Sequence, residues 1–158
     1  MKNLLSRLNK ELQEIEHELK HKLPEEIRKA AALGDLSENA EYEAARDRQR
    51  LMQSKYRSLK ARINEIARVD ISRIPTDRVG YGAIVEVLDL DTDEEKKYQL
   101  VMPEDADAAH MRISVSSPIG KSLMGKVEGD EVTINIPSGK RNYEVLGMTP
   151  YTETDMSL

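Results

Sequence analysis

The chain contains no cysteine, no tryptophan and no phenylalanine among its 158 residues. Without cysteine it can form no disulfide, and it has no thiolate to serve as a nucleophile or a metal ligand. No apolar run approaches the ~20 residues of a membrane-spanning helix, and residues 1–20 lack the apolar core and cleavage site of a signal peptide. We therefore expect a cytoplasmic protein with no membrane segment and no thiol chemistry.

Charge is distributed unevenly along the chain. Residues 1–74 hold 16 Lys and Arg against 13 Asp and Glu, a net charge of +3, whereas residues 75–158 hold 8 against 16, a net charge of −8. The overall composition, 34% charged and 39% hydrophobic, is typical of a folded globular protein. The change in charge balance predicts two modules, residues 1–74 and residues 75–158.

Residues 3–32 have the pattern of a long helix with a coiled-coil seam. Apolar side chains recur alternately three and four residues apart, which places them on one helical face. They are Leu5, Leu8, Leu12, Ile15 and Leu19, continued less regularly by Leu23, Ile27 and Ala30. Pro24 interrupts this segment, so we expect a kink or local break there, with the proline at the first position of a restarted helix.

A second helical segment follows after a short link. Its seam repeats the same spacing, at Met52, Tyr56, Leu59, Ile63 and Ile66. The link contains Gly34, which we expect just beyond the end of the first helix because glycine adopts the left-handed conformation found there. The two seams predict an antiparallel helical hairpin whose arms are each ~45 Å long.

Residues 75–158 predict a small domain of strands with one short helix. Segments rich in β-branched and aromatic residues are separated by turn sequences, at 83–88, 96–102, 112–116, 131–136 and 141–147. Ser117 and Pro118 have the pattern of an N-cap followed by proline at the first helical position. The predicted fold class is α+β: an N-terminal antiparallel coiled-coil hairpin and a C-terminal β-sheet domain.

A five-residue stretch in the first helix, His17 to His21, matches the HExxH pattern of zinc peptidases. A zinc site needs at least three protein ligands in a shaped cavity, and the only other histidine is His110, in the second module. The seam residues Ile15 and Leu19 would turn both histidines outward. We interpret the pattern as solvated residues on a helix face and expect no peptidase activity.

The link between the helices, GDLSENAEY at residues 34–42, holds three acids and no base. Asp35 and Glu38 fit a capping pair that would satisfy free backbone N–H groups at the start of the second helix, and spacing alone favours this role. Leu36, however, is left among acids with little to pack against, which indicates that a partner docks there.

The same two acids suggest a second, chemical role. Mg²⁺ requires six oxygen ligands, so two carboxylates can only complete a site whose other ligands belong to a partner. Residues 46–73 follow directly with nine bases and three acids. Such a basic segment suits approach to a nucleic acid, although an ordinary solvated coiled-coil face has the same composition.

Several longer segments resemble the Gre family of transcript cleavage factors, most closely its GreA type. They are GDLSENAEYEAARDRQ at 34–49, DTDEEKKYQLV at 91–101, and ISVSSPIGKSLMGKVEGDEV at 113–132 with the following IPSGKRNYEVL. The resemblance extends in order over nearly the whole chain. It implies that residues 75–158 form an FKBP-like domain that docks on the polymerase, and that residues 1–74 enter its secondary channel.

The resemblance also implies how such a factor acts. It is not itself an enzyme and has no cofactor of its own; Asp35 and Glu38 would help bacterial RNA polymerase hold a second, shared Mg²⁺ while it cleaves backtracked RNA. Leu36, Ser37, Asn39, Glu41 and Tyr42 would support this tip. Arg46, Arg48 and Arg50 would face the 3′ segment of the nascent RNA or the channel wall. The factor is expected to act as a monomer.

Two departures from the family pattern concern the first arm. Family members often carry a basic residue shortly before the tip, where this chain has Ala30 to Ala32, and the segment from Pro24 to Gly34 is a few residues short. A non-catalytic or inhibitory polymerase-binding module remains the alternative, although the intact GDLSEN argues against inhibition. We expect no prolyl isomerase activity, because the second module has no Phe or Trp to line a pocket.

Overall fold

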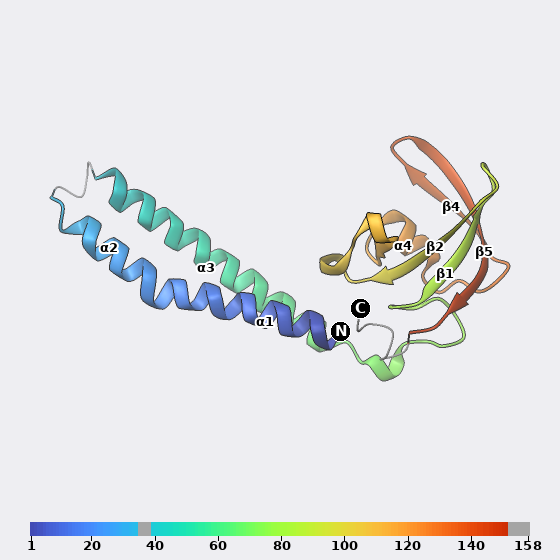
Figure 1. The fold of residues 1–158 in the computed structure, drawn as a ribbon, viewed down its shortest axis with the longest axis horizontal. Helices are drawn as coiled ribbons and strands as arrows, with labels where there is room; N and C mark the ends of the chain where they lie inside the picture. The colour runs from blue at the N-terminus through green and yellow to red at the C-terminus, as the bar shows by residue number, and fades with distance from the viewer. Residues whose placement is uncertain (35–38, 152–158) are drawn as a thin grey trace. The chain divides into compact units, whose positions relative to one another are not determined.

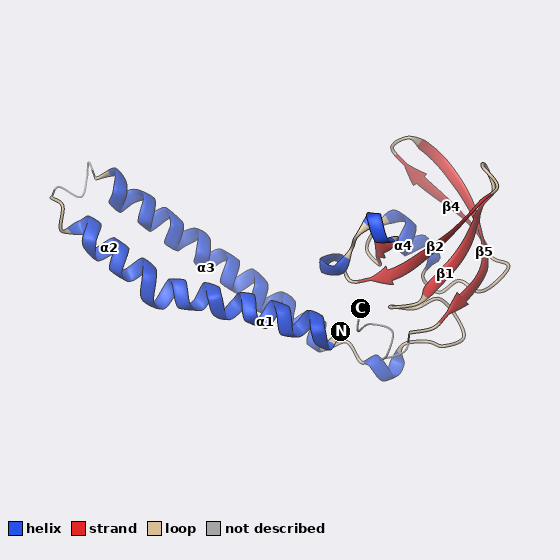
Figure 2. Ribbon diagram, viewed as in Figure 1, coloured by secondary structure: helices blue, strands red, loops and turns tan. Residues whose placement is uncertain are grey.

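The computed structural model describes residues 1–34 and 39–151, and the predicted tip residues Asp35, Leu36, Ser37 and Glu38 lie outside them. The chain divides into two compact units between Val69 and Asp70. The first unit is entirely helical in its described part, and all described strands belong to the second (Figure 2). This arrangement confirms the predicted α+β class.

The first unit is an antiparallel hairpin. Helix α1 spans Lys2–His17, a π-helical turn spans Glu18–Lys22, and α2 spans Leu23–Ala31; the second arm is the single helix α3, Ala40–Ala67. Both α1 and α2 run alongside α3 (Figure 1). The 28 residues of α3 correspond to a length of ~42 Å.

The first arm, where a kink or local break was expected at Pro24, has a local irregularity directly before the proline. The backbone stays right-handed helical, but it widens to a π turn in which the Leu23 N–H donates to the Glu18 carbonyl, five residues back. Proline lacks an N–H, and its ring clashes with the carbonyl four residues earlier, here that of Lys20. The irregularity therefore lies before the proline, in residues 18–22, and α2 begins with Pro24 in its first turn.

The seam between the arms largely follows the predicted spacing. The buried apolar side chains are Met1, Leu4, Leu8, Ile15, Leu23 and Ala30 on the first arm and Ala45, Met52, Ile63 and Ile66 on the second. Leu4 rather than the predicted Leu5 is buried, and Leu5 is half-buried. Neighbouring leucines lie ~100° apart on a helix, so packing against α3 decides which of them turns inward.

The second unit is built on one five-stranded sheet of order β3-β2-β1-β5-β4. Its strands are β1 Ile84–Asp89, β2 Glu94–Val101, β3 Arg112–Ser114, β4 Glu131–Ile136 and β5 Gly139–Thr149. Neighbours are antiparallel except β2 and β3, and a bulge at Glu86–Val87 shifts the β1–β5 register. Short 3-10 turns span Ile71–Arg73, Pro103–Asp105 and Ala108–His110.

Alternation along the strands places one face of this sheet in the core. Val85, Val87 and Val145 are almost completely buried, as are Leu100 and Leu123. Helix α4, Pro118–Leu123, packs beside β3 and β4 (Figure 1). The predicted Ser117 cap is confirmed: its hydroxyl accepts a hydrogen bond from the Gly120 N–H at 3.0 Å and donates one to the Ser114 carbonyl at 2.7 Å.

Candidate functional site

The ends of the two arms are joined by the side chain of Asn39. Its Oδ1 accepts a hydrogen bond from the Tyr42 N–H at 3.0 Å, which caps the N-terminus of α3. Its Nδ2 donates to the Ala30 carbonyl of α2 at 2.5 Å. One side chain thus satisfies a free N–H group of one helix and binds a carbonyl in the last turn of the other.

Asn39 therefore occupies the N-cap of α3, a role that the sequence pattern had assigned to Asp35. Both residue types cap helices well, so spacing could not distinguish them. The Ala30 carbonyl does, because an amide can donate to it and a carboxylate cannot. The predicted capping pair of Asp35 and Glu38 is wrong as a description of this N-cap.

The end of α2 also differs from expectation. The helix ends at Ala31 with Ala32 as its C-cap, so Gly34 lies one position beyond the predicted place, with φ at +128°. The last turn tightens, with the Leu33 N–H donating to the Ala30 carbonyl at 3.2 Å. Glycine tolerates this backbone conformation at little cost, whereas a residue with a Cβ is strained there.

The first turn of α3 carries two of the predicted tip residues. Glu41 is exposed and Tyr42 is half-buried. Glu41 and Glu43 lie in that first turn, where negative charge interacts favourably with the helix dipole. This position gives Glu41 and Glu43 a structural explanation.

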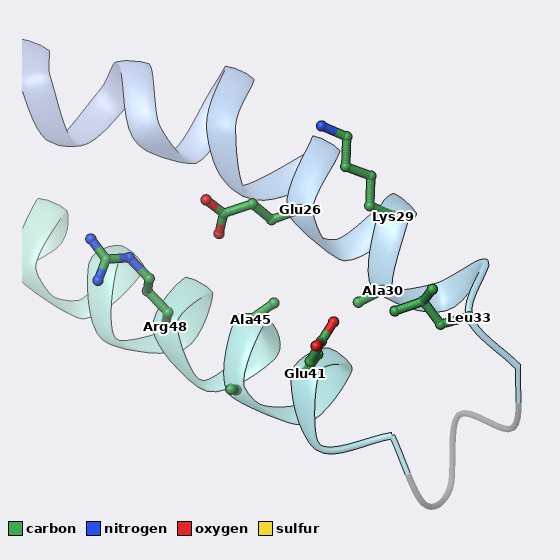
Figure 3. Close-up of a pocket in the computed structure, with 8 residues that line it drawn as sticks. Glu26, Lys29, Ala30, Leu33, Glu41, Ala45 and Arg48 are labelled. Carbon is green, nitrogen blue, oxygen red and sulfur yellow. The ribbon is translucent and has the colours of Figure 1, made fainter.

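A shallow groove runs between α2 and α3 just behind the tip (Figure 3). Ala30 and Ala45 face each other across it, and Leu33 stands at its edge with 69% of its surface exposed. The other residues that line it are Glu26, Lys29, Glu41, Ala44 and Arg48. The facing side chains are small here, so the described part of this end of the hairpin has little apolar core.

The three predicted RNA-facing arginines do not share one surface. Arg46 and Arg50 line a polar groove with Tyr42, and both are exposed. Their hydrogen bonds are local, from Arg46 to Gln49 at 3.2 Å and from Arg50 to Asp47 at 2.7 Å. Such exposed pairs are weak and exchange readily for other partners.

Arg48 lies on the side of α3 that faces the first arm. Its Nε donates to the Glu18 carboxylate at 2.5 Å, and this hydrogen bond and charge raise the pKa of Arg48. Residues two apart on a helix point ~200° from each other, which is why Arg48 is separated from Arg46 and Arg50. Sequence reasoning grouped all three because it counted charge without tracking the helical face.

The HExxH residues lie where the π turn begins. The rings of His17 and His21 are exposed, with centroids 4.8 Å apart, and Glu18 is the acid that pairs with Arg48. Across residues 1–34 and 39–151, no three His, Asp or Glu side chains are grouped so that they could hold a metal ion. Glu18, the glutamate of the HExxH pattern, is thus paired with Arg48 of the other arm.

No described helix combines the length and apolar content that crossing a membrane requires.

One acid of the sheet unit is completely buried. Asp89 has no exposed surface, accepts the Asp91 N–H at 3.0 Å and lies 3.4 Å from an Arg141 guanidinium nitrogen. This network holds the β1–β2 turn against β5. Its residues fall within and beside the segments that carry the family resemblance, so part of that motif is structural.

Two protein-family models match the chain, one to each unit. The model described as "Transcription elongation factor, N-terminal" matches residues 2–68, and "Transcription elongation factor, GreA/GreB, C-term" matches residues 74–150. Together they span both described units.

Individual relatives carry the same description. "Transcription elongation factor GreA" of Brucella anthropi is 42% identical over 142 residues, and that of Brucella canis is 41% identical, each alignment covering 90% of both chains. Among solved structures, a GreA/GreB factor from Nitrosomonas europaea is 29% identical over 58% of this chain and 78% of its own, with a TM-score of 0.43. Because this TM-score is below 0.5, the relationship to the GreA/GreB family rests on the sequence matches.

Proposed function

Because the chain belongs to the GreA/GreB family of transcription elongation factors, we propose that it binds bacterial RNA polymerase in the cytoplasm and stimulates the polymerase's own cleavage of backtracked RNA. In this proposal the helical hairpin enters the secondary channel, and Asp35 and Glu38 act at the active centre. The observation that carries it is the two-unit family match together with an intact GDLSEN at the end of the hairpin.

The chemistry of the tip supports a borrowed active site. Asp35 and Glu38 would supply carboxylate oxygens to a Mg²⁺ whose remaining ligands belong to the polymerase and the RNA, since two side chains cannot complete six-fold coordination. The bound metal would activate the attacking water. Asn39 occupies the N-cap of α3, so this proposal does not require either carboxylate to serve as that cap. Catalysis in this proposal belongs to the polymerase.

The hairpin geometry supports separate roles for the arginines. Arg46 and Arg50 share an exposed groove with only local partners, and we assign them to contact with the RNA 3′ segment or the channel wall. Arg48 is paired with Glu18 on the inter-arm side, and we assign it to the hairpin itself. The sheet unit would dock on the polymerase surface at the channel entrance.

The test is cleavage of RNA in a backtracked elongation complex at saturating factor. Asp35→Ala and Glu38→Ala should each slow cleavage by about 100-fold, the upper range seen when a group supporting a catalytic metal is removed. Glu43→Ala, which removes an exposed acid from the first turn of α3, is the matched control and should cleave like the parent. All three should compete for polymerase equally well.

Two results would contradict the proposal. If Asp35→Ala and Glu38→Ala cleave at the parental rate, the two acids do not act in the reaction. If the parent protein binds the elongation complex but slows cleavage, it is an inhibitory module instead.

A second comparison tests the arginine assignment. Loss of both Arg46 and Arg50 should weaken polymerase-complex binding and flatten its salt dependence, because each phosphate contact contributes to the salt slope. Arg48→Ala should leave the salt dependence unchanged. Equal effects of Arg48→Ala and Arg46→Ala would show that the helical face does not matter.

A further inference from the structure

Asn39 contacts both arms of the hairpin at the point where they meet. Its amide is half-buried and uses both ends: the oxygen caps α3 through Tyr42, and the nitrogen donates to the Ala30 carbonyl. The Ala30 carbonyl also accepts from the Leu33 N–H, so the same oxygen anchors the last turn of α2. This amide thereby couples the end of one helix directly to the start of the other.

Among the described residues, few apolar side chains pack around the hydrogen bond between Asn39 and Ala30. Ala30 and Ala45 are the buried apolar residues nearest the tip, and alanine offers only a methyl group to hold the arms together. Leu33, the largest apolar side chain lining the groove, is mostly exposed. Polar contacts must therefore fix the arm separation here, a task that leucine and methionine perform farther along the hairpin.

We propose that Asn39 is a positioning residue that holds the ends of α2 and α3 at a fixed separation, and that losing this link lowers the maximal rate of transcript cleavage more than the affinity for polymerase. The effect on cleavage rests on the proposed function. The effect on arm separation belongs to the free protein and does not depend on it.

Two substitutions remove the hydrogen bond from residue 39 to the Ala30 carbonyl while keeping the N-cap of α3. Asn39→Asp keeps a strong N-cap acceptor but places a carboxylate, which has no donor, opposite the Ala30 carbonyl. Asn39→Ser also retains a cap and adds no charge, so it controls for electrostatics. Asn9→Asp is the matched control, because the Asn9 amide donates to the Leu5 carbonyl within α1 and joins no second helix.

The absence of cysteine makes a direct distance measurement simple. Leu33→Cys and Ala44→Cys place spin labels on exposed positions of opposite arms beside the same groove. The parent and Asn9→Asp should give one narrow distance distribution. Asn39→Asp and Asn39→Ser should broaden it and shift it to longer distances, with helical content unchanged by circular dichroism.

Cleavage and binding are then measured on the same variants without labels. Both Asn39 variants should cleave about tenfold more slowly at saturating factor, consistent with the loss of one hydrogen bond, and their affinity for the elongation complex should change less than about twofold. A merely stabilising role would leave the saturated rate unchanged once folded protein is in excess.

The outcomes distinguish this inference from the proposed function. Parental distances in both Asn39 variants would overturn it, and so would widened distances with a parental cleavage rate. A parent protein that stimulates no cleavage would refute the proposed function, and the distance comparison would then decide the role of Asn39 in the hairpin by itself.

Discussion

The helical hairpin and the sheet unit bury their apolar side chains in cores of different extent. The hairpin core is a single seam, in which Ile15, Leu23 and Met52 form one small cluster. The sheet unit has a continuous core in which residues such as Val85 and Leu100 are completely buried. The part of the chain that carries the proposed chemistry thus has the smaller core clusters.

The hairpin compensates with polar contacts along its surface. Ion pairs one helical turn apart occur at Glu16–Lys20 and Glu25–Lys29, and Arg48–Glu18 crosses between arms. Exposed pairs stabilise a helix only slightly, so these ion pairs add little to the stability of the hairpin. The comparison teaches that hairpin geometry near the tip depends on a few specific hydrogen bonds, whereas the sheet unit depends on buried volume.

The largest expected effect is in the sheet core. Leu100→Ala should lower the free energy of unfolding by about 3 kcal/mol, because it removes a fully buried side chain and leaves a cavity. Leu90→Ala, at an exposed position of the same unit, is the control and should change stability little. Urea unfolding checks this. A similar loss for both variants would mean that burial does not govern this unit.

A smaller effect is expected near the tip of the hairpin, where Ala30 and Ala45 face each other. Ala45→Leu should force the arms apart near Ala30 and destabilise the hairpin by about 2 kcal/mol through overpacking. Ala44→Leu adds the same side chain at an exposed position and is the matched control. Thermal unfolding followed by the helical signal at 222 nm distinguishes the two. If Ala45→Leu is stabilising, the seam contains unfilled space beside Ala45 that can accommodate a larger side chain.

The sheet unit should also respond to alkaline pH through Tyr81. Burial raises the pKa of this hydroxyl from 10.0 to about 12. The folded state then retains its proton longer than the unfolded state, so this contribution to stability is complete below pH 10 and is lost as pH rises toward 12, by about 1 kcal/mol at pH 11.

Tyr81→Phe provides the comparison, because it removes the titrating group and should flatten this part of the stability profile. Urea unfolding at pH 9 and pH 11 measures the difference. Equal pH dependence in parent and variant would contradict the assignment to Tyr81.

The smallest effect is expected for the ion pair between the arms. Arg48→Ala and Glu18→Ala should each change the Tm only slightly, with a favourable coupling in the double-mutant cycle that weakens as salt is raised, since both side chains are accessible to solvent. Arg62 and Glu65, a pair within α3, serve as the control cycle. Coupling that persists in 1 M salt would show that the Glu18–Arg48 pair is better shielded than its exposure indicates.

Much of the fold follows from local pattern. The alternating three- and four-residue spacing specified both arms, because a helix places such residues on one face whatever lies around it. The strand segments and the Ser117 cap could likewise be predicted, because alternation and capping depend on neighbours in sequence. Asp35 and Glu38 stand out in the sequence, and their roles stay a prediction, because they lie outside the described residues.

The details of the hairpin that the tertiary structure decided all involve the opposite arm. Whether Leu4 or Leu5 turns inward depends on what α3 presents to them, and the pairing of Arg48 with Glu18 depends on which residue of the first arm lies opposite. A one-dimensional pattern contains no information about these partners.

By itself, then, the sequence determined that two helices form a hairpin with acids at its turn and that a sheet unit follows it in the chain. Only the tertiary structure decided which residue joins the arms. Asp35 and Asn39 are both good N-cap residues in local terms. Asn39 takes the position where its amide also reaches the Ala30 carbonyl, and that carbonyl comes into reach only when α2 has folded back along α3.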